Sequence, residues 1–229
     1  MKMYRFILFD LDDTIFDFQK AQWYCFSDVL KQYNETYSEE KYKKYKEINH
    51  FYWKLVEEQK MQREFAQCQR FTTFFSELGK NINGADANIV YQKSLTNQTW
   101  LIPYATEVCK FLSLTYELVF ITNGFTNTQV ERVQKSGIAD YFQKIIVSEE
   151  LGIEKPSIDF FKKALKLIGS NDTSKMIIVG DSLSSDIAGA NNAGIDCCWY
   201  NPNKNAVSSK YNINYVINDL RELLRLFCN

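Results

Sequence analysis

The sequence predicts an α/β fold: a doubly wound, mostly parallel Rossmann-like sheet with an all-helical domain inserted into it. Two observations predict this class. Short apolar runs alternate with segments of helical periodicity along most of the chain, as in parallel strands connected by helices. One stretch, residues 17–96, has no good strand and is helical in character throughout. We therefore expect a core of residues 1–16 and 97–229, with residues 17–96 inserted after the first strand.

Six segments of the expected core are predicted as strands. The first four are nearly continuous apolar runs, which is expected when helices cover both faces of a parallel sheet. In chain order, the predicted strands are Tyr4–Asp10, Tyr116–Asn123, Lys144–Ser148, Lys175–Asp181, Ile195–Asn201 and Asn214–Asn218.

Helices are predicted between these strands. Three of them are followed by a glycine (Gly137, Gly169 or Gly194), which favours the end of a helix. Pro156 precedes one helix and suits its first turn, where no backbone N–H is needed. In chain order, the predicted helices are Tyr104–Thr115, Thr126–Ser136, Ser157–Ile168 and Leu183–Ala193.

The inserted segment is rich in aromatic side chains and predicts a small helical bundle. Packing inside the bundle is the expected role of most of them. The aromatic residues noted are Trp23, Tyr24, Phe26, Tyr33, Phe51, Tyr52, Trp53, Phe65, Phe71, Phe74 and Phe75.

The composition excludes several function classes. The chain has 229 residues and a net charge of -1, without the basic excess of a nucleic-acid binder, so no nucleic acid polymer is expected as a partner. Hydrophobic residues make up 45%, with only 3 Pro and 9 Gly, which indicates a packed core rather than disorder. The first apolar run stops at Asp10 without a cleavage site, and no run reaches membrane-spanning length. We expect a cytoplasmic protein without membrane association.

Cysteine and histidine offer little chemistry. The six cysteines contain no C-x-x-C pair and have no matching histidine cluster, so we expect buried free thiols in a reducing compartment. The single histidine, His50, is expected on a helix of the inserted segment. The cysteines are Cys25, Cys68, Cys109, Cys197, Cys198 and Cys228.

Three carboxylates, Asp10, Asp12 and Asp13, follow directly on the first apolar strand. Like charges this close repel one another, and burying them is costly unless a cation lies between them. The stretch is therefore either a solvated loop or a metal site that includes a nucleophile.

Polar residues suited to phosphate chemistry recur at three further places. The second strand ends in Thr122-Asn123-Gly124, and the fourth ends in Gly180-Asp181-Ser182, with Asp186 close behind. Lys155 and Pro156 follow the third strand. In an open parallel sheet the carboxyl ends of the strands share one edge, where ligands bind. Each element is weak evidence alone, but the ordered set of four favours a single site.

These residues fit a phosphoryl-transfer site. Asp10, Asp181 and Asp186 can share Mg²⁺, a hard ion that takes oxygen ligands, and Lys155 can balance the remaining negative charge. Asp10 can attack phosphorus and form an aspartyl-phosphate. Asp12 can protonate the leaving oxygen and later take a proton from water. Thr122 and the backbone amides of Asn123 and Gly124 can hold the phosphoryl oxygens.

In these four elements, the chain resembles the haloacid dehalogenase superfamily of phosphohydrolases. The resemblance covers the whole chain, and the helical insertion is similar to the type-1 cap of that family. It implies Mg²⁺ held by the Asp10 side chain, the Asp12 backbone carbonyl and Asp181, with Asp186 in support. It implies Asp10 as the nucleophile and Asp12 as the acid/base residue. The phosphate contacts that it implies are Thr122, Asn123 and Lys155.

Three stretches of the core resemble a narrower branch, the bacterial pyrimidine 5′-nucleotidases. They are ITNGFTNTQ (121–129), VSEELGIEKP (147–156) and GDSLSSDIAGANNAGIDCCWYN (180–201). The resemblance implies a small phosphorylated metabolite as substrate, namely a pyrimidine or noncanonical nucleoside 5′-monophosphate. We expect a monomer or a weak homodimer.

Other activities of the same fold stay open to different degrees. A haloacid dehalogenase uses the same nucleophile on carbon but needs neither Asp12 nor a Mg²⁺ site. A phosphonatase uses a Schiff-base lysine in the cap and has no acid at the position of Asp12. A non-catalytic binding module would be expected to lose Asp10 or Asp12. The alternatives kept are a phosphatase acting on a sugar phosphate, phosphoglycolate or an acylneuraminate phosphate, then a phosphomutase, and last a haloacid dehalogenase.

Substrate choice would depend on the inserted segment. Trp53 and Arg70 are singled out there as candidates for substrate contact. Core packing is the alternative for Trp53, and surface solvation is the alternative for Arg70 and for the neighbouring Lys60 and Arg63.

Overall fold

The computed structural model describes residues 3–58 and 60–227. The chain forms two compact units, one of Met1–Phe18 with Thr99–Asn229 and one of Gln19–Gln98. We call them the core unit and the helical unit.

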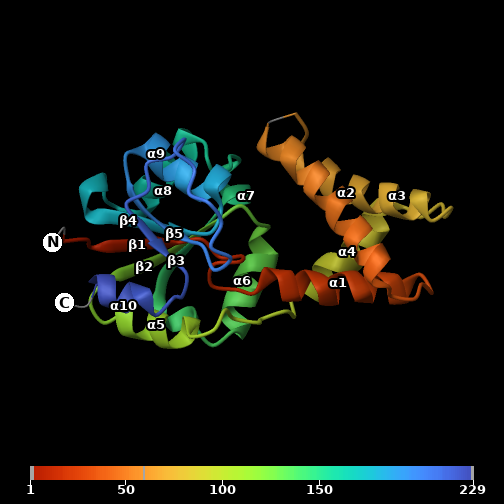
Figure 1. Cartoon of the computed structure of the whole chain (residues 1–229), viewed down its shortest axis with the longest axis horizontal. Coiled ribbons are helices and arrows are strands. Elements are labelled where there is room, and N and C mark those ends of the chain that lie inside the picture. The colour runs from red at the N-terminus through yellow and green to blue at the C-terminus, as the bar shows by residue number, and fades with distance from the viewer. Residues whose placement is uncertain (1–2, 59, 228–229) are drawn as a thin grey trace. The chain divides into compact units, whose positions relative to one another are not determined.

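The core unit is built on a six-stranded sheet in which every strand pair is parallel (Figure 1). The order of strands is β3-β2-β1-β4-β5-β6, so the first strand lies inside the sheet. The predicted doubly wound parallel sheet is confirmed. The strands are β1 (Phe6–Phe9), β2 (Glu117–Thr122), β3 (Phe142–Val147), β4 (Met176–Gly180), β5 (Asp196–Tyr200) and β6 (Tyr215–Ile217).

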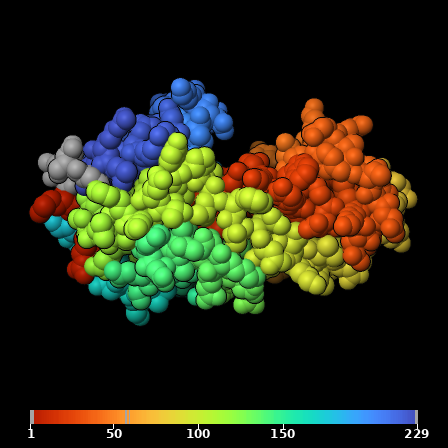
Figure 2. All heavy atoms as spheres, turned by 90° about the horizontal axis from the view of Figure 1, so that it is seen from below, coloured from red at the N-terminus to blue at the C-terminus, as the bar shows by residue number. Residues whose placement is uncertain are grey.

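Helices cover both faces of the sheet. The helices and single turns of the core unit are α5 (Ala105–Leu112), α6 (Thr126–Lys135), η1 (Ala139–Tyr141), α7 (Ser148–Leu151), α8 (Ile158–Ile168), η2 (Thr173–Lys175), η3 (Leu183–Ile187), α9 (Ala188–Ala193) and α10 (Glu222–Phe227). Side chains of α5, α6 and α10 pack on one face, and those of α8 and α9 pack on the other (Figure 1). Figure 2 shows the first of these faces, where α5 and α6 form a continuous layer.

Alternation along β1 explains why its sequence is apolar at every position. Ile7 and Phe9 belong to one hydrophobic cluster, while Phe6 and Leu8 belong to the cluster on the opposite face. All four side chains are buried. A strand that faces helices on both sides has no solvent-facing positions, so its polar residues appear only where it ends.

Three details differ from the sequence prediction. The side chain of Ser157 caps α8 by accepting a hydrogen bond from the Asp159 amide (3.3 Å), so Pro156 precedes the cap and is not in the first turn. The predicted helix over Leu183–Ala193 is a π-helical turn, η3, followed by the short α9. The strand β3 begins at Phe142, two positions earlier than its apolar pattern indicated, because Phe142 is only partly buried and Gln143 is exposed.

The helical unit contains α1 (Phe18–Gln32), α2 (Glu39–Glu57), α3 (Arg63–Glu77) and α4 (Gly84–Leu95). Ser38 and Asn83 cap α2 and α4 through their side chains. Aromatic rings fill the interior, with Phe26 stacked on Tyr45 at 4.4 Å between ring centroids. Not all the aromatic side chains are internal, since Phe51 and Phe65 are exposed.

Arg70 does not lie on the surface, contrary to the solvated position considered for it. Its guanidinium is buried and donates to Asn49 Oδ1 (2.7 Å) and Asn88 Oδ1 (3.1 Å). It also lies 4.4 Å from the ring centroid of Tyr91. Because its charge is engaged inside the bundle, Arg70 fits a structural role there. Trp53 is half-buried and donates to Asn49 Oδ1 as well (3.1 Å).

Several smaller expectations can be compared with the described residues. Cys25, Cys109, Cys197 and Cys198 are buried free thiols, Cys68 is partly exposed, and Cys228 lies outside the described residues. His50 is an exposed residue of α2. Within residues 3–58 and 60–227, no helix combines the length and the apolar character needed to cross a bilayer.

Candidate active site

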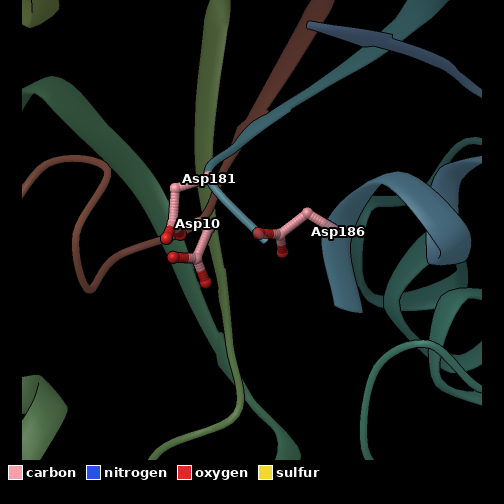
Figure 3. Close-up of side chains that lie close together, drawn as sticks. All are labelled: Asp10, Asp181 and Asp186. Atoms are coloured by element: carbon pink, nitrogen blue, oxygen red, sulfur yellow. The ribbon is translucent and has the colours of Figure 1, made fainter. Parts of the chain in front are cut away.

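Carboxylate side chains gather at the carboxyl end of the sheet, where the parallel strands β1 and β4 end. Asp10 follows β1 directly, Asp181 follows β4, and Asp186 lies in the turn η3. One oxygen from each of the three carboxylates lies within 4.8 Å of the other two. Figure 3 shows the three side chains converging on one place. The prediction that these three residues come together therefore agrees with the geometry.

Burial of this cluster disfavours the negatively charged form of its carboxylates. Burial raises the pKa of Asp10 to about 8, with the negative charges of Asp186 and Asp12 adding to the effect and Lys155 opposing it. The pKa of Asp181 is also raised well above its usual value, first by burial and then by the charge of Asp10. A cluster of buried oxygen ligands with excess negative charge fits a hard divalent cation.

Lys155 supplies the internal positive charge of the site. Its buried ammonium donates to Asp10 Oδ1 (2.6 Å), Asp186 Oδ1 (2.7 Å) and the Ile121 carbonyl oxygen (2.8 Å). These contacts use all three donors of the ammonium. Burial alone lowers the pKa of Lys155, but the charges of Asp10 and Asp186 outweigh it and the net shift is upward. Lys155 therefore stays charged at neutral pH.

Asn123 holds Lys155 in place through a pair of hydrogen bonds. Asn123 Oδ1 accepts from the Lys155 amide (2.8 Å), and Asn123 Nδ2 donates to the Lys155 carbonyl oxygen (2.9 Å). The side chain of Asn123 is thus engaged with the backbone of the lysine. Asn123 was predicted to contact phosphate, and its backbone amide is the group that we propose for this contact.

Asp186 is fixed from two directions. Its Oδ1 accepts from Lys155, and its Oδ2 accepts from the backbone amide of Ser182 (3.1 Å). Gly180 passes beneath it so closely that a Cβ atom there would lie 2.3 Å from Asp186 Oδ2. Only glycine leaves room for the carboxylate at this position.

Asp181 is fixed less tightly. Thr14 Oγ1 donates to Asp181 Oδ1 over a long 3.4 Å, and the indole of Trp199 donates to the Asp181 backbone carbonyl (2.8 Å). Its side chain is partly exposed, unlike that of Asp186. Of the three carboxylates, Asp181 therefore has the most access to solvent.

Asp12 lies on the loop that follows β1. This loop folds back on itself, because the Asp13 amide donates to the Phe16 carbonyl (2.7 Å) and the Phe16 amide donates to the Leu11 carbonyl (2.8 Å). Asp13 adopts a φ of 59°, a conformation that Asp tolerates better than most residues. The Asp12 carboxylate is partly exposed and accepts hydrogen bonds from Gln129 Nε2 (2.7 Å) and an Arg132 guanidinium nitrogen (2.6 Å).

Gln129 and Arg132 were not predicted as site residues. Both are buried residues of α6, and Arg132 is fully enclosed. For Arg132, the indication in the sequence is its position next to Val133 on a helix expected to pack on the sheet, and Gln129 ends the quoted stretch ITNGFTNTQ. A buried arginine is rare unless it is paired, but the local pattern does not identify the partner.

Comparison with known proteins places this arrangement in a family. Residues 7–200 match the family model of the haloacid dehalogenase-like hydrolases. YfnB of Bacillus subtilis, named as a HAD-hydrolase, is 34% identical over 99% of this chain and 96% of its own length. The structure of YfnB bound to magnesium has a TM-score of 0.95, covers 99% of both chains and reveals interdomain movement in that protein.

Two further relatives have names that specify an activity. PynA of Streptococcus pneumoniae, a pyrimidine 5′-nucleotidase, is 34% identical over 87% of this chain and 84% of its own. YjjG of Escherichia coli, also a pyrimidine 5′-nucleotidase, is 28% identical over 97% of both chains. The match of the family model covers most of the chain, and the identity to YfnB extends along nearly all of it. The chain therefore belongs to the family of haloacid dehalogenase-like hydrolases, as its motifs predicted.

Proposed function

We propose that the protein is a Mg²⁺-dependent phosphomonoesterase that forms an aspartyl-phosphate on Asp10 and acts on pyrimidine or noncanonical nucleoside 5′-monophosphates. The observation that carries the chemical part is the convergence of the Asp10, Asp181 and Asp186 carboxylates, two of which, Asp10 and Asp186, accept hydrogen bonds from the buried ammonium of Lys155. The names of PynA and YjjG support the substrate part.

Asp10 is the proposed nucleophile. One of its oxygens, Oδ1, accepts from Lys155, which leaves Oδ2 for attack on phosphorus. The bond that forms joins Asp10 to phosphorus, and the bond that breaks joins phosphorus to the leaving oxygen. Water then cleaves the acyl phosphate and regenerates the carboxylate.

Asp12 is the proposed acid and base. In the first step it gives a proton to the leaving oxygen, and in the second step it takes a proton from the attacking water. Its partial exposure suits both transfers, because the carboxylate must reach the leaving group and then water. The reaction therefore needs two carboxylates in two different surroundings.

The phosphoryl oxygens need donors that match their developing charge. We propose Thr122 Oγ1 and the backbone amides of Asn123 and Gly124 as these donors. The Lys155 ammonium, whose three N–H groups already have acceptors, is proposed to stabilise the phosphoryl charge through its positive charge. Thr122 is buried at the last position of β2, and the backbone amides of Asn123 and Gly124 follow it in the chain. Donors on a rigid strand end need little reorganisation during the reaction.

The carboxylate oxygens of Asp10, Asp181 and Asp186 fit Mg²⁺ by the nature of their donor atoms. Asp10, the Asp12 backbone carbonyl and Asp181 would hold the ion, with Asp186 in support. When bound, Mg²⁺ supplies Lewis-acid stabilisation of the phosphoryl charge. The helical unit is proposed as the cap, a role supported by the interdomain movement seen in YfnB.

The test is phosphate release from a panel of nucleoside monophosphates, sugar phosphates and phosphoglycolate, each assayed with Mg²⁺ and with a chelator. We expect UMP, CMP and dTMP to be preferred, and the chelator to abolish turnover. A sugar phosphate as best substrate would contradict the nucleotidase part only. Failure to hydrolyse any ester, or transfer of phosphate within the substrate, would contradict the phosphatase part.

Magnesium is expected to stabilise the fold more at pH 8 than at pH 6. Because the pKa of Asp10 is raised to about 8, its contribution to stability is fully present below the ordinary pKa near 4 and is lost as the pH rises through about 8. Mg²⁺ binds the ionised carboxylates and offsets this loss. At a concentration of about 100 Kd the stabilisation is about 2.7 kcal/mol, or a rise in Tm of roughly 5–10 °C.

The measurement is thermal unfolding with and without MgCl₂ at the two pH values. NaCl at equal ionic strength controls for screening by salt, and Asp10→Asn controls for the site. Equal shifts at both pH values, or an equal shift in Asp10→Asn, would rule out metal binding linked to ionisation of this cluster.

A further inference from the structure

Two residues of α6, Gln129 and Arg132, face the same direction because they are three positions apart on the helix. Both side chains are buried, with Gln129 only 2% and Arg132 0% exposed. The guanidinium of Arg132 also lies 4.6 Å from the ring centroid of Phe16, on the loop that carries Asp12. Burying two large polar side chains together requires partners for their polar atoms.

The partner that they share is the carboxylate of Asp12. Arg132 donates to Asp12 Oδ1 at 2.6 Å, and Gln129 Nε2 donates to Asp12 Oδ2 at 2.7 Å. The same guanidinium nitrogen donates to Gln129 Oε1 at 2.8 Å, which closes a ring of three side chains. Each carboxylate oxygen has two lone pairs, so each keeps one for a proton. The ring thus fixes the orientation of Asp12 without occupying all of its acceptor sites.

Gln129 extends this ring to the strand β2. Its Nε2 also lies 3.1 Å from Thr122 Oγ1, so one amide group contacts both the proposed acid/base residue and a proposed phosphate contact. Gly124 lies against the same side chain, and a Cβ there would be 2.4 Å from Gln129 Nε2. The Gln129 amide therefore lies between the loop that carries Asp12 and the end of β2 that carries Thr122. The proposed reaction needs these two elements to keep a constant relative position.

Stability alone is a poor explanation for this arrangement. A buried ion pair often contributes little net stability compared with apolar residues of the same size, because two charges lose their hydration. Here the arginine is enclosed, whereas 28% of the Asp12 side chain is exposed toward solvent. A fully enclosed guanidinium that binds a partly exposed carboxylate can fix the orientation of that carboxylate while leaving it accessible.

We propose that Gln129 and Arg132 are positioning residues that act through Asp12, holding its carboxylate for proton transfer and keeping it in register with Thr122. This inference rests on the proposed phosphatase function. It adds two residues on a helix, distant in sequence from the carboxylate, to the set that determines the rate of proton transfer.

The leaving group provides the distinguishing measurement. An alkoxide, such as the 5′ oxygen of a nucleotide, needs a proton from Asp12 as its bond to phosphorus breaks. Nitrophenolate is a stable anion and leaves without one. A defect in positioning Asp12 therefore slows phosphoryl transfer from UMP much more than from p-nitrophenyl phosphate. A general loss of structure slows both equally.

The experiment measures single-turnover rates of leaving-group release for both esters in Gln129→Glu, which keeps the shape of the side chain and places a carboxylate against Asp12. We expect a roughly 10²-fold slower reaction of UMP and little change with p-nitrophenyl phosphate. Gln134→Glu, the same change at an exposed position of α6, is the matched control. Arg132→Lys, which keeps the cation, is the second variant, and melting curves check the fold of each.

A double-mutant cycle completes the test. If Gln129 acts through Asp12, adding Gln129→Glu to Asp12→Asn slows the reaction of UMP no further. Equal slowing of both esters, multiplicative effects in the cycle, or wild-type rates in both Gln129→Glu and Arg132→Lys would overturn the inference while leaving the phosphatase intact. A wild-type protein that hydrolyses neither ester would instead overturn the proposed function, and this inference with it.

Discussion

Asp10→Asn is expected to lower kcat for phosphate release by about 10³-fold or more, because an amide cannot replace the carboxylate as nucleophile. The substitution keeps the shape of the side chain. It also removes one of the negative charges that raise the pKa of Asp181. The metal-free fold should therefore tolerate the change, and activity should be lost without unfolding.

The measurement is phosphate release under saturating substrate, with a melting curve of the same preparation. Asp159→Asn is the matched control, since Asp159 is an exposed residue of α8 that pairs with Lys162 on the surface. An Asp10→Asn protein with near wild-type activity would show that the nucleophile lies elsewhere.

Lys155→Met is expected to combine loss of activity with the largest loss of stability among these substitutions. Lys155 is buried between Asp10 and Asp186, and its removal leaves two buried carboxylates without their cation. Breaking a buried pair in this way typically costs about 3–5 kcal/mol. Urea unfolding measures the change in the free energy of unfolding directly.

The loss should depend on pH in a defined direction. The pKa of Lys155 is raised in the fold, so its stabilising contribution is fully present below its ordinary pKa and persists across pH 5–8. Burial already raises the pKa of Asp10, and loss of the ammonium removes a charge that opposes this rise. Asp10 can therefore become neutral by binding a proton at pH 5 but less so at pH 8, so the loss in Lys155→Met should be greater at pH 8. Lys162→Met, on the exposed face of α8, should change stability by less than about 1 kcal/mol. Equal stabilities of the two variants would show that the buried ammonium is not required.

The sheet and its polar edge could be predicted because both depend on short stretches of neighbouring residues. The apolar run of β1 ends abruptly at Asp10, and that of β2 ends at Thr122, so the ends of the strands are visible in the sequence. Parallel topology then brings these ends to one edge. The roles given to the residues at that edge remain predictions, and the substitutions above test them.

Contacts between distant segments could not be predicted in the same way. The pairing of Arg132 with Asp12 joins residues 120 positions apart, and nothing in the sequence near either residue indicates the other. Arg70 shows the same limit, because its partners Asn49 and Asn88 lie on other helices and turn a charged side chain inward. The π-helical turn at Leu183–Ile187 has the apolar spacing of an ordinary helix, so its periodicity did not reveal it.

The paired hydrogen bonds between Asn123 and Lys155 have a consequence for the segment that precedes the lysine. One side-chain amide satisfies both backbone groups of the lysine, as a neighbouring strand would, so β2 is in effect extended by a side chain. The backbone of Lys155 is thereby held in place by the end of β2 and not only by its own loop. Substitutions within residues 149–154 of this chain should therefore leave the ammonium beside Asp10.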